Sequence, residues 1–164
     1  MDGKDLSQIV LKKTEEFTKL CEGIDEGTAS KAPDGRWSPK EIVSHLCGPK
    51  EGGLLFAIKA FVEQDTPELP LHPGDPFFSD ERVRMPFSAL LAQFQKQYRE
   101  AAAFVAGLSP EQLGRKARIP ALKESPLGEY PTLAVFIQGI AEHHIGYHVD
   151  HMREILTALG AAPK

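Results

Sequence analysis

Apolar residues recur at alternating steps of three and four positions in four segments of the chain, which is the period of a buried helix face. No alternating strand pattern of convincing length lies between these segments. The second segment opens with Ser38-Pro39-Lys40-Glu41, a capping box in which the side chains of Ser38 and Glu41 satisfy free backbone N–H groups. The pattern therefore predicts four helices, at about residues 6–24, 38–61, 87–108 and 132–159.

Two long, proline-rich connections join the predicted helices. Residues 65–86 contain five prolines and residues 109–131 contain four. Each connection is longer than a turn between neighbouring antiparallel helices needs to be. The sequence therefore predicts an all-α four-helix bundle with long crossover loops. Loops of this length often form lids or walls of a site.

The composition narrows the classes of function. With 164 residues, 41% of them hydrophobic and 26% charged, the chain is expected to form one domain over residues 1–164. A net charge of −4 without a large basic cluster argues against nucleic acid as a partner. No segment resembles a signal peptide or a membrane span, and two cysteines are too few for a disulfide framework. A cytoplasmic location without a membrane partner is expected.

The fourth predicted helix carries three histidines where a bundle helix normally has leucine or isoleucine. Burying an imidazole without a partner costs roughly 1–3 kcal/mol, and a metal ion removes that cost by binding the lone pairs. Two histidines one turn apart, His144 and His148, form a good clamp for such an ion. The alternative is a set of surface or hydrogen-bonded core histidines. The apolar stripe reads Leu133, Ile137, Ile140, His144, His148, His151 and Ile155.

A third ligand must come from another helix, and His45 lies in the apolar sector of the second one, beside Leu46. His72 is in a Pro/Gly loop and is expected to be exposed, while His143 is expected beside the ligands or in solvent. Cys47 faces away from His45 and is not expected to join the same metal.

Gly48-Pro49 predicts an irregular backbone next to His45. Pro49 lacks the N–H that would bond to the carbonyl of His45, and its ring crowds that carbonyl. Two outcomes are open: a kink in one helix, or the end of one helix and a second helix from about Gly53.

Two segments resemble a known family. The segment WSPKEIVSHL, from Trp37 to Leu46, resembles the W-S-x-x-E-I-x-x-H-L segment of the DinB/YfiT-like metalloenzymes. The segment HIGYHVDHM, from His144 to Met152, resembles their second segment, H-x-x-x-H followed after two residues by Gln and an aliphatic residue. Leu159-Gly160 also matches the usual close of the family's last helix. His151 stands where the family commonly has Gln.

The resemblance implies a four-helix bundle with a metal site made of His45, His144 and His148. Members of the family bind zinc, nickel, manganese or iron, and many form homodimers. The characterised relatives are mostly thiol-dependent: bacillithiol S-transferases, mycothiol-dependent maleylpyruvate isomerase and the iron-binding domain of ergothioneine-type sulfoxide synthases. A low-molecular-weight thiol is therefore expected as co-substrate, together with a small-molecule substrate.

Three functions are weighed from the sequence. The favoured one is a metal-dependent thiol S-transferase, in which His151 serves as general base because the ordinary pKa of histidine lies near the working pH. A metal-dependent hydrolase is the nearest alternative. The third is a non-catalytic dimeric bundle with a vestigial or structural metal site. Glu41 is the other candidate base, but its capping role already explains it. Two positions are open for His151 itself: its ring reaches back to the metal or a metal-bound water, or it lies one layer beyond His148 and bonds to a carboxylate or carbonyl of a neighbouring helix. The second position, with contact to the site through water, is favoured because two ligands from one helix already fill that side.

Overall fold

The computed structural model describes residues 1–161, so the last three residues of the predicted 1–164 domain lie outside it. Within this range the chain is helical, with two isolated β-bridges and no strand. The predicted all-α four-helix bundle is confirmed, although two of its four helices are interrupted. The long elements are α1 (Gly3–Cys21), α3 (Pro39–Cys47), α4 (Leu54–Glu63), α6 (Phe87–Ala106), α8 (Leu133–Gln138), the π-helix η2 (Gly139–Ile145) and α9 (Gly146–Ala158).

Four short helices lie in the connections between the long ones. None of the helices in residues 1–161 has the combination of length and apolar character that a membrane span requires. The short helices are α2 (Glu26–Ala29), α5 (Asp80–Arg84), α7 (Pro110–Leu113) and the 3₁₀-helix η1 (Pro120–Leu122).

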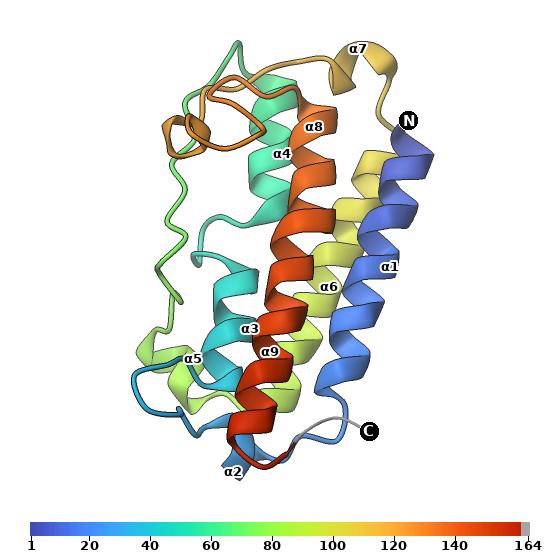
Figure 1. Ribbon diagram of the computed structural model, residues 1–164. Helices are drawn as coiled ribbons and strands as arrows, with labels where there is room; N and C mark the ends of the chain where they lie inside the picture. The colour runs from blue at the N-terminus through green and yellow to red at the C-terminus, as the bar shows by residue number, and fades with distance from the viewer. Residues whose placement is uncertain (162–164) are drawn as a thin grey trace.

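The bundle has one crossover connection. In Figure 1, α1 and α8–η2–α9 run in one direction, and α3–α4 and α6 run in the other. Because α4 and α6 are parallel, the chain from Glu63 to Asp80 returns along the side of the bundle before α6 begins. The other long connection, residues 107–132, stays at one end of the bundle.

The buried residues follow the predicted stripes in the first three helical segments. Gly3, at the start of α1, lies against the carbonyl oxygen of Val105 near the end of α6, where a Cβ atom has no room. Phe17 on α1 and Phe94 on α6 are fully buried, with ring centroids 5.2 Å apart. These contacts fix α1 and α6 as an antiparallel pair on one side of the core.

The second helix ends at Gly48, as one of the two outcomes predicted for Gly48-Pro49. Gly48 has φ +74°, a left-handed conformation that glycine adopts without strain, and its N–H bonds to the carbonyl of His45. A new helix, α4, begins at Leu54. His45 therefore lies in the last turn of a nine-residue helix.

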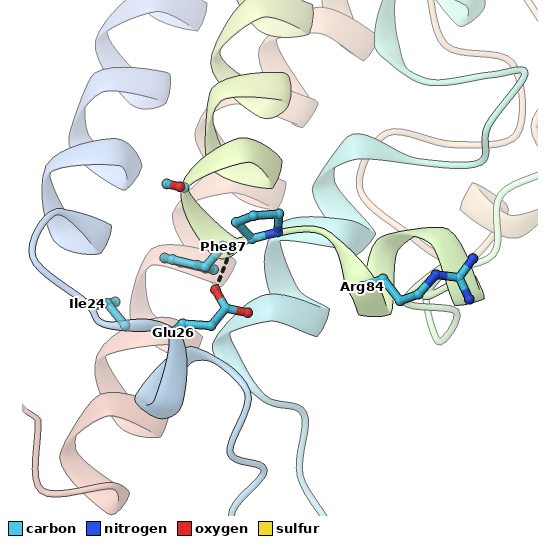
Figure 2. Close-up of a pocket in the computed structure, with 6 residues that line it drawn as sticks. Ile24, Glu26, Arg84 and Phe87 are labelled. Carbon is cyan, nitrogen blue, oxygen red and sulfur yellow. Dashed lines mark hydrogen bonds between the residues drawn. The ribbon is translucent and has the colours of Figure 1, made fainter.

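Glu26 joins three elements at the end of the bundle near α2. One carboxylate oxygen accepts from Lys40 Nζ on α3 at 2.8 Å, and the other accepts from the backbone N–H of Phe87 at the start of α6 at 2.6 Å. Figure 2 shows this carboxylate beside Phe87. Lys40 is only 3% exposed, and it also donates to the carbonyl of Val83 on α5. This network holds the first turn of α3, and with it the helix that carries His45.

Candidate metal centre

His45, His144 and His148 converge from two sides of the bundle. Each offers one ring nitrogen, and these nitrogens lie within 4.8 Å of one another. Nε2 of His45 on α3 is 3.1 Å from Nε2 of His144 on η2, close to the roughly 3.3 Å that separates two nitrogens bound to one zinc ion. The ring of His148, on α9, has its centroid 4.8 Å from each of the other two. The structure thus brings together the three residues that the sequence singled out.

The predicted core stripe of the fourth helix is correct in part: Leu133, Ile137, His148 and Ile155 are buried, whereas Ile140, His144 and His151 are only partly buried. The side chains of Ala141, Ile145 and Met152 also face the core, each 0% exposed. Two adjacent stripes fit the helical period, and the one with larger apolar side chains is buried because imidazoles cost more to desolvate.

A π-helical turn carries His144. The seven residues of η2, from Gly139 to Ile145, interrupt an otherwise α-helical segment, and His144 is the sixth of them. Such turns insert an extra residue into the helix, which shifts its register, and they are frequent at functional sites. The sequence prediction took this region as regular α-helix, since no residue type marks a π-turn as glycine marks a helix end.

His45 is held in one tautomer by a backbone carbonyl. Its Nδ1 lies 2.7 Å from the carbonyl oxygen of Asp75 in the crossover connection. A carbonyl only accepts, so Nδ1 carries the proton and Nε2 keeps a lone pair facing His144. The predicted capping box at the start of the same helix is present, with Ser38 and Glu41 bonded reciprocally to each other's backbone N–H, so Glu41 is occupied as a cap.

His144 has a buried nitrogen without a partner. Among the described residues, its Nδ1 has no hydrogen bond and no exposure to solvent. Its Nε2 faces a nitrogen of His45 that bears no proton. Three neutral imidazoles with converging nitrogens and an unsatisfied ring atom fit a divalent late transition-metal ion, which accepts imidazole lone pairs.

Burial keeps the three rings uncharged at neutral pH. Desolvation lowers the pKa of His45, and it lowers the pKa of His144 to about 4 with a further contribution from the neighbouring His45. The pKa of His148 falls to about 2, because desolvation is joined by the charges of the adjacent histidines. Neutral imidazole is the form that binds a metal ion.

Aromatic side chains surround the three rings. The indole of Trp37 has its centroid 5.2 Å from that of His45 and lies nearly parallel to His148 at 6.5 Å. Phe77 stacks on His45 with centroids 6.1 Å apart, and the exposed ring of Tyr147 meets the ring of His148 at 5.0 Å. Sequence reasoning included Trp37 and Tyr147 only as members of the two motifs, and it missed Phe77, whose contact with His45 depends on the tertiary structure.

His151 contacts the cluster directly. Its Nδ1 lies 3.3 Å from Nδ1 of His148, so one of these two atoms donates to the other. The expected hydrogen bond to a carboxylate or carbonyl of a neighbouring helix is thus replaced by a bond within the same helix. His72 and His143 are exposed, as expected. Cys47 is fully buried and directs its Sγ towards the carbonyl of Leu90, away from the cluster.

One of the two long connections reaches the site. The crossover connection contributes Asp75 and Phe77, whereas residues 109–131 pack at the far end of the bundle, where Arg115 donates to the carbonyls of Phe61 and Gln64. Of the two connections that could wall the site, residues 65–86 therefore reach it and residues 109–131 do not. Two cavities, of about 390 and 480 Å³, also lie elsewhere; Figure 2 shows the first, beside Glu26 and Arg84.

The lowered pKa of His148 predicts an acid-sensitive stability of the metal-free protein. Below pH 6.5 the unfolded chain protonates this histidine and the folded chain does not, so the free energy of unfolding falls as the pH falls. The slope from His148 alone is about 1.4 kcal/mol per pH unit, continuing towards pH 2. The free energy of unfolding, measured with urea at pH 7, 6 and 5, should fall less steeply with decreasing pH in His148→Asn than in wild type. His143→Asn, at an exposed position, is the control and should follow wild type. If the free energy of unfolding depends equally on pH in all three proteins, the lowered pKa of His148 is contradicted.

The fold is similar to that of a solved structure. It matches YfiT from Bacillus subtilis, described as "a probable metal-dependent hydrolase with an unusual four-helix bundle topology", with a TM-score of 0.73. The match covers 96% of this chain and 87% of that one, at 19% sequence identity, and shows a shared fold. No curated protein sequence matches the chain.

The sequence also matches a family model. The model describes the DinB superfamily, and the match extends over residues 11–155. This range includes all or most of each of the four long helical segments of the bundle, and it contains His45, His144 and His148. The chain belongs to the DinB superfamily.

Proposed function

We propose that this protein is a metal-dependent enzyme that binds one divalent cation on His45, His144 and His148. Its reaction joins the sulfur of a small thiol co-substrate to an electrophile. The observation that carries the proposal is the convergence of three neutral imidazoles, with the lone pair of His45 fixed by the carbonyl of Asp75. Zinc, nickel, manganese and iron are the candidate ions.

The donor set suits catalysis better than a purely structural role. Structural zinc sites have four protein ligands, whereas catalytic sites have three and leave a position for water or substrate. The described residues supply three converging nitrogens. A divalent cation held by three neutral ligands keeps its full positive charge and favours loss of a proton from a thiol or a water that binds beside it.

His151 is the residue placed to receive that proton. When the other nitrogen of His148 binds the metal, its Nδ1 carries the proton and donates to Nδ1 of His151. His151 Nδ1 then keeps the lone pair, and it takes up a further proton when this contact opens. Partial burial, and then the positive charge of Arg36, lower the pKa of His151, so the ring is neutral and able to accept a proton near neutral pH. The contact with His148 also links the orientation of the two rings.

The surroundings favour a thiol over water as the group that loses the proton. Within residues 1–161, the three rings make no hydrogen bond to a carboxylate, whereas zinc hydrolases of the H-E-x-x-H type use a Glu as general base. The neighbouring side chains are the aromatic rings of Trp37, Phe77 and Tyr147, which favour contact with a polarizable sulfur over contact with water.

A metal-dependent hydrolase is the second candidate, and it is supported by the description of YfiT as a probable metal-dependent hydrolase. In that case His151 accepts the proton of water in place of that of a thiol. A dimeric bundle without catalytic activity is the third possibility, and a site that admits no exogenous ligand would favour it.

Addition of a thiol to the cobalt-substituted protein separates these functions. L-cysteine should produce a sulfur-to-cobalt charge-transfer band in the near ultraviolet, because the open position accepts the sulfur. S-methyl-L-cysteine, whose sulfur has no proton to lose, is the control and should leave the spectrum unchanged. A cobalt spectrum that responds to neither compound would contradict the transferase proposal.

His151→Gln should separate proton transfer from metal binding. The variant should retain one metal ion per chain, measured by elemental analysis, because His151 contacts His148 and does not converge with the three ligands. The cysteine-induced cobalt band should form more slowly, by about tenfold or more, because the nearby proton acceptor is lost. His148→Ala is the comparison and should lose the ion. If His151→Gln loses the ion as completely as His148→Ala does, His151 is itself a ligand.

A further inference from the structure

Arg82 on α5 is a buried cation without an acidic partner. Its side chain is 7% exposed, and no ion pair to it exists among residues 1–161. Its hydrogen bonds all come from Nη1, at 3.1–3.2 Å, and end on neutral oxygens. An arginine keeps its charge at any physiological pH, so burying it against neutral groups is costly unless those groups need the donor. The acceptors are the carbonyl and Oγ of Ser44 and the carbonyl of Phe77.

These acceptors belong to the two segments that meet at His45. Ser44 directly precedes His45 in the last turn of α3, and its Oγ also donates to the carbonyl of Phe77 at 3.0 Å. Arg82 and Ser44 therefore tie the crossover connection to the end of α3. The positive charge also lies at a helix C-terminus, where it is favoured by the helix dipole.

The tied segment has a strained backbone. Phe77 has φ +50°, which is unusual for a residue with a side chain and persists only where the surroundings hold it. Its N–H donates to Oδ1 of Asp75 at 2.7 Å, its carbonyl accepts from Ser44 and Arg82, and its ring stacks on His45. Phe77 is thus fixed on three sides.

The consequence of this arrangement falls on His45. The carbonyl that accepts from His45 Nδ1 belongs to Asp75, two residues before Phe77 in the same tied segment. If the segment moves away from α3, His45 loses the acceptor that keeps its proton on Nδ1. The ring is then free to place the proton on Nε2, which cannot bind a metal in that form.

We propose that Arg82 is a positioning residue for the metal centre: by clamping Phe77 to Ser44 it holds the Asp75 carbonyl against His45 Nδ1 and keeps the His45 Nε2 lone pair directed at the site. This inference rests on the proposed function for its effect on metal binding, but the tautomer of His45 tests it in the protein without metal. A role limited to capping α3 would leave that tautomer unchanged.

The test compares Arg82→Met with Arg84→Met. Arg84 is on the same short helix, is exposed, and makes no hydrogen bond or ion pair within residues 1–161; Figure 2 shows its guanidinium pointing away from Glu26. Long-range ¹H–¹⁵N correlation spectra of chelator-treated protein report which nitrogen of His45 carries the proton. Zinc affinity is measured separately by competition with a chelating dye.

Wild type and Arg84→Met should show the proton of His45 on Nδ1. Arg82→Met should show it wholly or partly on Nε2, and its zinc affinity should fall about 10–100-fold, as expected for the loss of a group that orients a metal ligand. Ser44→Ala removes one link of the same clamp without removing the charge. It should move both readouts in the same direction by a smaller amount, and it provides the test if Arg82→Met does not fold.

An Arg82→Met protein that folds, keeps the His45 proton on Nδ1 and binds zinc within twofold of wild type overturns the proposal. If Arg82→Met is unfolded, unchanged readouts in Ser44→Ala overturn it. A wild-type protein that binds no zinc contradicts the proposed function alone, because the tautomer comparison still decides whether Arg82 positions His45.

Discussion

Each of the two nitrogens of a buried imidazole needs a partner other than bulk water. The structure around His45, His144 and His148 depends on this requirement. One nitrogen of His45 is satisfied by the carbonyl of Asp75, and one nitrogen of His148 by His151. Of the remaining nitrogens, one from each ring converges with the other two, where only a proton or a metal ion can join them, while Nδ1 of His144 has no partner among the described residues. Because burial lowers the pKa of all three rings, the metal ion is the favoured occupant at neutral pH.

The bundle positions these rings by interrupting its own helices. α3 ends at Gly48, which places His45 in a last turn whose carbonyls are open to side-chain donors such as Arg82. The opposite helix contains a π-turn at His144. Regular helices would pack more simply, but the irregular turns allow polar groups to reach the interior. The crossover connection, which a simple up-down bundle lacks, supplies the carbonyl that orients His45.

The sequence predicted the helical bundle and the three converging histidines, because both are encoded by residue type and spacing. The capping box at Ser38 follows from local chemistry, and the helix end at Gly48 is one of the two outcomes that Gly48-Pro49 left open. The π-turn and the true core stripe through Ile145 and Met152 were not predictable in this way, since two neighbouring stripes fit the same period. The role of Asp75 was hidden for another reason: it acts through its backbone carbonyl, so its side chain carries no signal.

X-ray absorption spectroscopy of the zinc-loaded protein shows whether these three imidazoles bind one cation. We expect one zinc per chain with three imidazole nitrogens at about 2.0–2.1 Å, and fewer imidazoles or no bound zinc in His45→Ala. Zinc bound with the same coordination in wild type and His45→Ala, or no stoichiometric zinc in wild type, would mean that the three imidazoles do not form one cation site.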